Sequence, residues 1–445
     1  MSDTIAAVAT AYGVGAISIV RVSGPEAKRV ALVVSGREDL TPRYAHLATL
    51  RNGAGETIDR AIVLFFQAPF SFTGEDIVEF QCHGGSAVAQ LLLEELYRLG
   101  IRPARPGEFS QRAFLAGKMD MAQIEAMAAL ITTQSLEGAK LLARQLKGEL
   151  GQTVAAIRDE LLTLIAHAEV LIDYAEEDLP QDLVTTITEK LTQISARLEK
   201  ALAVSRRREG ILHGYKLAIL GKPNVGKSSL LNALLGDERA IVSEIAGTTR
   251  DIIEEQLRIG SHLVKIVDTA GIRQTDDRIE QLGIERSRKA ASEADVLLAM
   301  FDQSRPWDEE DDAILSLVRS YEKDKDILVI INKSDLPAVW RWHGKWPALT
   351  ICVSEGVEGV INVLAQLLDA KEVPQELFFV STRQMEAVVR TVESIHHAFT
   401  PLHAGELELF SYHLREAVDA IGAITAPYET EEMLGRMFSE FCLGK

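Results

Sequence analysis

The sequence of 445 residues lacks features that would place it in several large classes of protein. It has only three cysteines, Cys82, Cys352 and Cys442, and no CxxC pair or Cys/His cluster of zinc spacing. Such a sparse, odd set argues against a disulfide framework and a structural zinc site, and it fits a reducing compartment. No uninterrupted apolar run is long enough to cross a bilayer, so no membrane association is expected.

A secretory signal is also missing. The first twenty residues are fairly apolar, but they lack a basic opening segment, carry Asp3, and are broken by Gly13 and Gly15. We therefore expect a cytoplasmic protein.

The sequence has fewer basic than acidic residues. Basic residues number 47 against 65 acidic ones, which gives a net charge of -18. Because phosphate contacts come from Lys and Arg, this balance opposes extensive nucleic-acid binding, although it does not exclude a local basic patch. The remaining composition, 47% hydrophobic and 25% charged, is that of an ordinary globular protein, and the length suggests roughly three domains.

The chain changes texture along its length. Residues 1–118 alternate short β-like runs with turns and helical patterns, which predicts an α/β or α+β domain. Residues 119–213 and 371–445 carry helical periodicity, for example from Leu142 to Ile165, and are expected to form one all-α domain. Residues 214–370 alternate strand and helix, which predicts a largely parallel sheet with helices on both faces, inserted into the helical domain. The strands expected in that domain are Lys216–Leu220, Leu263–Val267, Val296–Phe301, Ile327–Ile331 and Leu349–Val353.

A phosphate-binding loop is the strongest single motif. Gly221-Lys-Pro-Asn-Val-Gly-Lys-Ser228 matches the pattern GxxxxGKS between a strand-like run and a helix-like one. The glycines let backbone N–H groups surround phosphates at a helix N-terminus. Lys227 is expected to contact the β- and γ-phosphates, and Ser228 to bind Mg²⁺.

Two further segments complete the phosphate end of the site. Asp268-Thr-Ala-Gly271 closes a second strand, where an aspartate can hold Mg²⁺ through water and the Gly271 amide can meet the γ-phosphate. Gly247-Thr-Thr-Arg-Asp251 lies between the two motifs and offers a threonine hydroxyl for Mg²⁺ in a switch loop. Ile272 follows Gly271, and isoleucine cannot orient a water molecule as glutamine does in many GTPases.

The base is selected by Asn332-Lys-Ser-Asp335, which ends a fourth strand. An aspartate carboxylate accepts two parallel hydrogen bonds from N1–H and the 2-amino group of guanine, and adenine offers neither. The expected ligand is therefore GTP. A cluster of Trp340, Trp342 and Trp346 follows this motif, and it is read either as an RNA-stacking surface or as a surface loop.

In these motifs the chain resembles the MnmE (TrmE) family of tRNA-modifying GTPases. The likeness covers nearly the whole chain and includes five further segments: Val20-Arg-Val-Ser-Gly-Pro25, Ser71-Phe-Thr-Gly-Glu-Asp76, His83-Gly-Gly85, Arg105-Pro-Gly-Glu-Phe-Ser110 and the tail Phe441-Cys-Leu-Gly-Lys445. The fold that it implies has three parts: an N-terminal α/β folate-binding and dimerisation domain, a helical domain, and an inserted Ras-like P-loop GTPase domain.

The resemblance implies roles for individual residues. K⁺ is bound by Asn224, Ser243, Ile245 and Thr248, and it takes the place of an arginine finger when two GTPase domains meet. Thr249 binds Mg²⁺ with Ser228, and Glu280 orients the attacking water, although it could equally be a solvated glutamate at a helix start. The residues implied to contact GTP are Asn224, Val225, Gly226, Lys227, Ser228, Ser229, Ser243, Glu244, Ile245, Ala246, Gly247, Thr248, Thr249, Asp268, Thr269, Ala270, Gly271, Asn332, Lys333 and Asp335.

The resemblance also implies a second ligand. Arg21, Glu79 and Lys118 match positions that bind 5-formyl- or 5,10-methylene-tetrahydrofolate, and the alternative is that all three are surface or structural charges. Cys442 in the CxGK tail is a candidate nucleophile or a small packing residue. Two departures from the family bear on these sites: Ala11-Tyr12 replaces the usual Pro-Pro, and Cys352-Val-Ser-Glu355 does not align with the last guanine-contact motif.

The implied activity is GTP- and K⁺-dependent modification of C5 of the wobble uridine in certain tRNAs, which adds an aminomethyl or carboxymethylaminomethyl group. The implied assembly is a homodimer that forms a heterotetramer with an FAD-carrying partner of the MnmG (GidA) family, since this chain has no GxGxxG fingerprint of its own. Two alternatives stay open: an Era-like regulatory GTPase of ribosome assembly, and a paralogue that has lost folate use.

Overall fold

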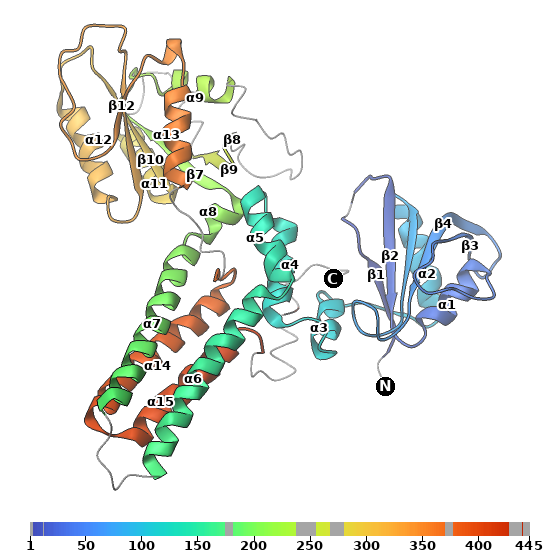
Figure 1. Cartoon of the computed structure of the whole chain (residues 1–445). Helices are drawn as coiled ribbons and strands as arrows, with labels where there is room; N and C mark the ends of the chain where they lie inside the picture. Colours follow the sequence, from blue (N-terminus) through green and yellow to red (C-terminus); the bar gives the residue numbers. More distant parts are fainter. Residues whose placement is uncertain are drawn as a thin grey trace. The chain divides into compact units, whose positions relative to one another are not determined.

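The structure is a computed structural model of the chain that describes residues 3–11, 13–173, 181–236, 255–267, 280–369, 377–426 and 438. By their internal contacts the residues divide into two compact units. The first unit takes residues 1–128, 154–163 and 418–445, and the second takes 129–153 and 164–417. Figure 1 labels the elements of both units.

The first unit contains a six-stranded sheet in the order β3-β4-β5-β2-β1-β6. Its neighbouring strands pair antiparallel except β1 and β6, which run parallel. The strands of this sheet and the helices among and after them, as far as residue 132, are β1 (Ile5–Val8), β2 (Ile17–Ser23), α1 (Ala27–Ser35), β3 (His46–Arg51), β4 (Thr57–Phe66), β5 (Ile77–His83), α2 (Ser86–Arg98), β6 (Arg102–Pro103), α3 (Glu108–Leu115) and α4 (Met121–Thr132).

The two faces of this sheet have different partners because successive side chains of a strand alternate between them. Val20 and Val22 of β2 join the core that also contains Val30 of α1 and Leu92 of α2. The residue between the two valines, Arg21, therefore projects from the opposite face. On that side a smaller cluster gathers Ile5, Ala7, Ala104 and Phe109, with Phe72 packed against it.

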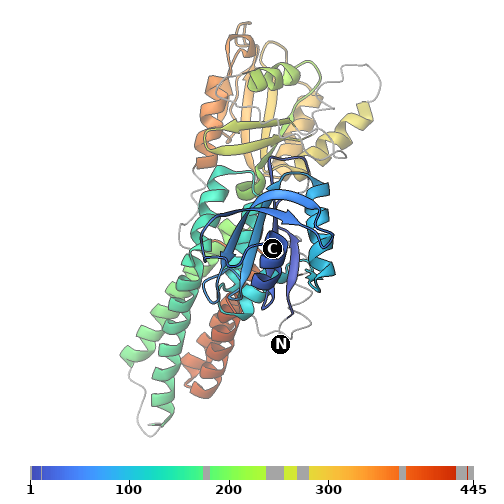
Figure 2. The ribbon, with the colours of Figure 1, turned by 90° about the vertical axis from the view of Figure 1, so that its right-hand side faces the viewer.

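Helices dominate the middle and the end of the chain. The helices that precede and follow the strands of the second sheet are α5 (Leu136–Leu146), α6 (Glu149–Asp173), α7 (Gln181–Ser205), α8 (Arg208–His213), α14 (Thr382–Ala404) and α15 (Leu407–Gly422). Figure 1 shows α7 and α14 side by side, and the Nε2 atom of His396 lies 2.9 Å from Ser195 Oγ between them; Figure 2 shows the same helices from the side. The amphipathic helical run expected from Leu142 to Ile165 is divided between two helices, because Gly148, with φ of 87°, separates the end of α5 from the start of α6.

The second unit contains the other six-stranded sheet, in the order β12-β11-β10-β7-β9-β8. All its pairs are parallel except β8 with β9. Its elements are β7 (Tyr215–Leu220), α9 (Lys227–Gly236), β8 (Glu255–Ile259), β9 (His262–Ile266), α11 (Glu280–Glu293), β10 (Val296–Asp302), α12 (Glu309–Ser320), β11 (Asp326–Asn332), β12 (Ala348–Thr350), the short 3-10 helix η1 (Val353–Glu355) and α13 (Glu358–Asp369).

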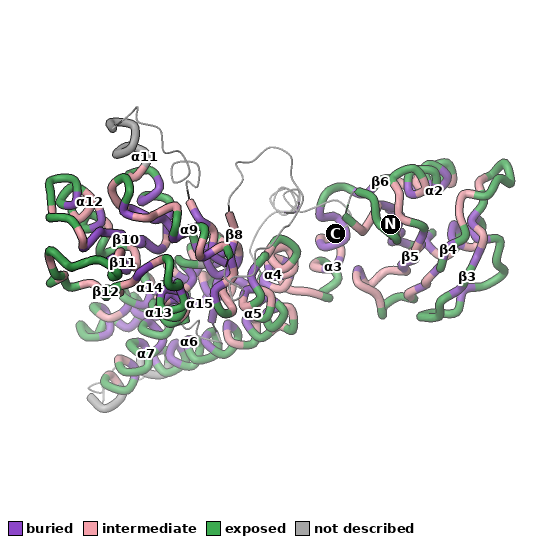
Figure 3. Tube along the Cα trace, turned by 90° about the horizontal axis from the view of Figure 1, so that it is seen from above, coloured by how far each residue is buried: buried purple, intermediate pink, exposed green. Residues whose placement is uncertain are grey.

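This sheet is buried on both faces. Every residue of β10 is buried, and Figure 3 colours buried residues purple. The strand is accordingly an uninterrupted apolar run up to its last residue, Asp302. Ala218 and Leu220 of β7 pack in the cluster with Ala291 of α11 and Val318 of α12, while the alternate residue Ile219 is buried on the other side. The predicted combination of an α/β part, a set of long helices and a largely parallel sheet is confirmed.

One predicted strand is wrong in extent. The run Leu349–Val353 forms only the end of β12, and η1 begins at Val353. The backbone N–H of Val353 donates to Asn332 Oδ1 at 3.3 Å instead of to a neighbouring strand. A side-chain acceptor therefore replaces the ladder hydrogen bond, and the strand ends. Among the helices of the described residues, none is both long and apolar enough to span a membrane.

Candidate nucleotide-binding site

The phosphate loop joins the end of β7 to the start of α9 and leaves no room for side chains at its two glycines. A β-carbon on Gly221 would lie 2.6 Å from the carbonyl oxygen of Met300 in β10. Gly226 has φ of 106°, and a β-carbon there would lie 2.4 Å from Asn332 Nδ2. Both positions require glycine because the loop packs directly on the neighbouring strands.

The lysine of the loop is held by the loop itself. Lys227 Nζ donates to the carbonyl oxygens of Gly221 at 2.7 Å and Lys222 at 2.9 Å. Burial lowers the pKa of Lys227, because it disfavours the charged form. Lys227, Ser228 and Ser229 begin α9, so their N–H groups point out of a helix N-terminus. A phosphate placed there would meet an ammonium group and the N–H groups of the first turn of a helix.

The guanine motif is attached to the phosphate loop through Asn332. This buried side chain ends β11, and its Nδ2 atom donates to the carbonyl oxygen of Val225 at 2.8 Å. Its Oδ1 atom accepts from Val353 N, which brings the segment Cys352–Glu355 to the same place. Asn332 therefore joins the phosphate loop to both segments, and Asp335, three residues on, is exposed.

Asp302 is a site residue that the sequence analysis missed. It is the last residue of β10 and is only 5% exposed. Its Oδ2 atom accepts from Lys333 Nζ at 2.6 Å, and its Oδ1 atom accepts from Ser304 Oγ at 2.6 Å. Burial alone would raise the pKa of Asp302, but these hydrogen bonds outweigh it and the pKa is lowered. An aspartate at the end of an otherwise apolar strand, at the edge where parallel sheets bind ligands, was the available signal.

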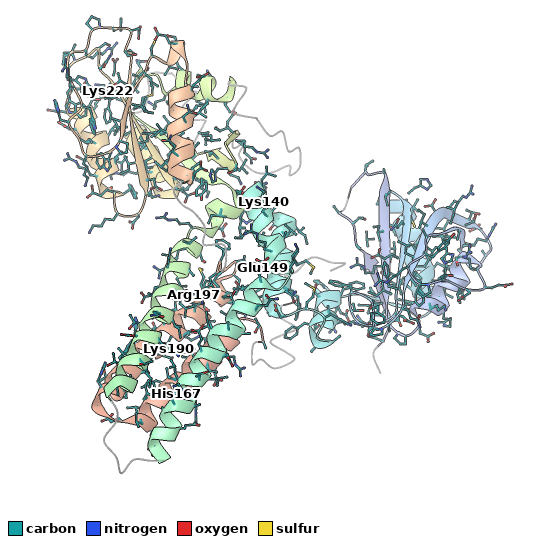
Figure 4. All side chains as sticks on the ribbon, in the orientation of Figure 1. Lys140, Glu149, His167, Lys190, Arg197 and Lys222 are labelled. Carbon is teal, nitrogen blue, oxygen red and sulfur yellow. The ribbon has the colours of Figure 1, made fainter. Side chains whose placement is uncertain are left out.

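A second carboxylate contact fixes the phosphate loop from the other side. Lys222, labelled in Figure 4, donates to Asp308 Oδ2 at 2.6 Å and Asp311 Oδ2 at 2.7 Å. Asp308 is also the N-cap of α12, in a capping box with Asp311. Burial opposes the charged form of Lys222, yet the two carboxylates raise its pKa. One loop residue is thus tied to the first turn of α12.

Several predicted site residues lie outside the described residues. They are Ser243, Glu244, Ile245, Ala246, Gly247, Thr248, Thr249, Asp268, Thr269, Ala270, Gly271 and Cys442. Glu280 is the first residue of α11, and its side chain also lies outside the described part of the chain. Asn224 is described; it is exposed and has φ of 65°, a left-handed conformation that asparagine tolerates.

The three residues matched to folate binding lie on or beside one face of the first sheet. Arg21 and Glu79 are direct partners across β2 and β5, and Glu79 Oε1 accepts from Arg21 Nε at 2.9 Å. The guanidinium also lies 5.6 Å from the centre of the Phe72 ring and 5.7 Å from that of Phe109. Lys118 is exposed and lies close to Gly74, in the segment that carries Phe72.

Cys82 is buried in the core of the first unit. Burial raises the pKa of its thiol to about 12, so little thiolate exists at neutral pH.

Comparisons with known proteins show the family of the chain. The family model described as the MnmE helical domain matches residues 121–442, and that described as the GTP-binding protein TrmE N-terminus matches residues 4–118. A tRNA modification GTPase MnmE from Sulfurovum sp. is 52% identical over 100% of this chain and 99% of its own length. The protein of the same name from Sulfurimonas denitrificans is 51% identical over the same shares. The chain belongs to the MnmE family of tRNA modification GTPases.

Among solved structures, several GTPases match this MnmE family member over 40% of the chain or less. A crystal structure of Era in complex with MgGDPNP and nucleotides of 16S ribosomal RNA is 28% identical over 40% of this chain and 66% of that chain, with a TM-score of 0.25.

Proposed function

We propose that the protein hydrolyses GTP as a component of the enzyme that modifies C5 of the wobble uridine in certain tRNAs. The observation that carries the nucleotide part is the Asn332 side chain, which joins the phosphate loop to the guanine motif and leaves Asp335 exposed beside it. The tRNA part is supported by relatives that bear the name tRNA modification GTPase and match the full chain.

In this proposal each described residue has one task. Lys227 and the first amides of α9 hold the β- and γ-phosphates, Lys333 is held against Asp302, and Asp335 reads the base. Water attacks the γ-phosphorus, its bond to the β–γ bridging oxygen breaks, and GDP and phosphate leave. Mg²⁺, bound through Ser228 and Thr249, supplies positive charge to the phosphates. Glu280 at the start of α11 is proposed to orient the water, because Ile272 cannot.

The proposed K⁺ site gives the next prediction. We expect GTP hydrolysis to fall about tenfold or more when Na⁺ replaces K⁺, because a correctly placed cation neutralises charge that develops on the phosphates. Asn224→Gly should hydrolyse GTP slowly and equally in both salts. Glycine keeps the left-handed φ of 65° but removes the side-chain oxygen. The measurement is phosphate release at matched ionic strength.

Asn224→Asp is the matched control, since it keeps both an oxygen and tolerance of the left-handed conformation, and it should remain K⁺-dependent. Equal rates of the wild-type protein in K⁺ and Na⁺ would remove K⁺ from the mechanism.

Folate is proposed as the one-carbon donor, bound at Arg21, Glu79 and Lys118. The face fits such a ligand chemically, because the guanidinium of Arg21 lies near the Phe72 and Phe109 rings and pairs with the Glu79 carboxylate, and a pterin is a flat, polar ring. The four-part division at residues 118, 213 and 370, the homodimer, the FAD-carrying partner, tRNA binding and a cytoplasmic location belong to the same proposal. Relatives that match the whole chain support this enzyme over the Era-like alternative.

The deciding experiment is mass spectrometry of tRNA nucleosides from cells with and without the gene. We expect the C5-aminomethyl-type wobble uridines to disappear on deletion and to return with the wild-type gene. Unchanged nucleosides, together with retained GTP hydrolysis, would contradict the modification function.

A further inference from the structure

All four tryptophans of the chain gather at one pocket in the second unit. Trp307, Trp340, Trp342 and Trp346 line a cavity of about 780 Å³, together with residues of α12 and of the chain between β11 and β12. This volume is in the range of small-molecule and nucleotide sites. Nothing in the nucleotide site described above uses this pocket.

Packing accounts for part of the cluster. Parallel strands such as β11 and β12 are usually connected by a helix that covers the sheet, but residues 333–347 between them form no helix. The tryptophans take its place over Phe301, whose ring centre lies 4.9 Å from that of Trp307 and 6.1 Å from that of Trp342. Packing does not explain the whole cluster. Each of the four tryptophan side chains is only partly buried, so each keeps a surface exposed to the cavity.

Three of the four indoles lie roughly parallel to Phe301 or to each other, whereas Trp340 stands edge-on, at 83° to Trp307 and 88° to Phe301. Phe301 is inclined by 27° to Trp307 and by 21° to Trp342, and Trp342 is inclined by 22° to Trp346. Gly344 allows this arrangement, because a β-carbon there would lie 2.1 Å from Trp342 Cζ2. The three roughly parallel, partly exposed indoles of Trp307, Trp342 and Trp346 favour a flat aromatic ligand that stacks on one of them.

The charges at the pocket favour a ligand with negative charge. Both acidic groups of the lining are already engaged: Asp312 accepts from Trp307 Nε1 at 2.8 Å, and Glu322 pairs with Lys345 at 2.5 Å. Within the part of the chain that the structure describes, Arg341 has no such carboxylate partner, and it is exposed at the pocket next to Trp340 and Trp342. A chain with net charge of -18 therefore presents a basic group beside stacking surfaces here.

We propose that this pocket binds an unpaired nucleotide of single-stranded RNA, with the base stacked on the indoles and a phosphate held by Arg341. A flat ring next to a phosphate is the chemistry that parallel indoles and a guanidinium recognise together. The inference rests on the proposed function, because a tRNA substrate supplies unpaired loop nucleotides. The pocket is also connected to the guanine motif, since Trp340 Nε1 donates to the backbone oxygen of Asp302, whose side chain binds Lys333.

Intrinsic tryptophan fluorescence reports on this pocket alone, because all four tryptophans line it. The full chain, saturated with GDP, is titrated with a single-stranded oligoribonucleotide of about twelve nucleotides, a length in the range that one such surface covers. We expect saturable quenching by the single strand and much weaker quenching by the same sequence in a duplex, whose bases are already stacked.

Two variants test the two parts of the proposal. Arg341→Gln should weaken binding about tenfold and lower the slope of log K against log salt by about 0.7, the value for one phosphate contact on a single strand. Trp346→Leu should weaken binding by a similar factor without changing that slope. Arg206→Gln, an exposed arginine away from the pocket, is the matched control and should bind as the wild-type protein does. Binding of a fluorescent GDP analogue confirms that each variant is folded.

The proposal is overturned if the single strand does not quench, if the duplex quenches equally, or if Arg206→Gln weakens binding as much as Arg341→Gln. A protein segment would then be the remaining candidate for the pocket. The nucleoside analysis separates this failure from failure of the proposed function: modified uridines that depend on the gene, with no RNA quenching, reject only the pocket.

Discussion

Asp335→Asn is expected to lower the affinity for GTP at least about a hundredfold and to raise the affinity for xanthosine triphosphate. Asp335 is exposed, and we propose that its carboxylate accepts from both N1–H and the 2-amino group of guanine. An asparagine amide instead offers one acceptor and one donor, and its donor meets the 2-amino group of guanine. Xanthine carries an oxygen in place of that amino group, so the same amide complements it.

The measurement is displacement of a fluorescent GDP analogue by GTP and by xanthosine triphosphate. Asp324→Asn, which changes an exposed aspartate away from the guanine motif, should bind GTP as the wild-type protein does. A loss of affinity that is equal for the two triphosphates would mean that Asp335 supports the fold of the segment and does not read the base.

Glu108→Ala is expected to destabilise the first unit by about 3 kcal/mol, because removing one member of a buried ion-pair network leaves the others unpaired. Glu108 is 4% exposed. It accepts from Arg102 Nη2 at 2.6 Å, from Arg112 Nη2 at 3.2 Å and from the backbone N–H of Arg105 at 2.8 Å. These contacts tie the start of α3 to the strand end at β6, and Arg112 continues the network to Glu75.

Hydrogen exchange of β2 and β5 measures the stability of the first unit, while tryptophan fluorescence follows the second unit alone. Glu108→Ala should speed exchange in those strands and leave the fluorescence transition in urea unchanged. Glu94→Ala, an exposed glutamate of α2, is the control. Equal exchange in Glu108→Ala and the wild-type protein would show that the network adds no net stability.

The same network makes the stability of the first unit depend on pH in acid. Burial opposes the charge of Glu108, but its arginine hydrogen bonds outweigh burial and lower its pKa from 4.5 to about 2. A lowered pKa contributes stability that is present above the unfolded value and is lost as the pH falls through the folded one. The difference in exchange between the wild-type protein and Glu108→Gln should therefore shrink as the pH falls from 4.5 towards 2.

Much of the site could be predicted because its motifs are local. The phosphate loop and Asn332–Asp335 each lie within eight consecutive residues, and their residue types follow from the chemistry of phosphate and guanine. The partners of these motifs are distant in the sequence. Asp302 meets Lys333 across two parallel strands, and Lys222 meets Asp311 through a helix cap.

The fold shows the same division. Apolar strands of the second sheet were predictable from their composition, whereas the end of β12 was not, because it depends on the contact between Val353 and the side chain of Asn332. Periodicity predicted helix from Leu142 to Ile165 but not the break at Gly148, since glycine lowers helix propensity without fixing where a helix ends. The role of Glu108 depends on arginines of β6 and α3 that only the fold assembles.

The first unit draws on both ends of the chain, and this sets the order in which it can mature during synthesis. Phe438 packs with Met121 and Ile124, and the N–H of Met121 donates to the carbonyl oxygen of Thr425. A ribosome releases those late residues only after the whole second unit has been made. The apolar surface of α4 thus waits through most of translation without its cover, a period in which the nascent chain is most exposed to aggregation.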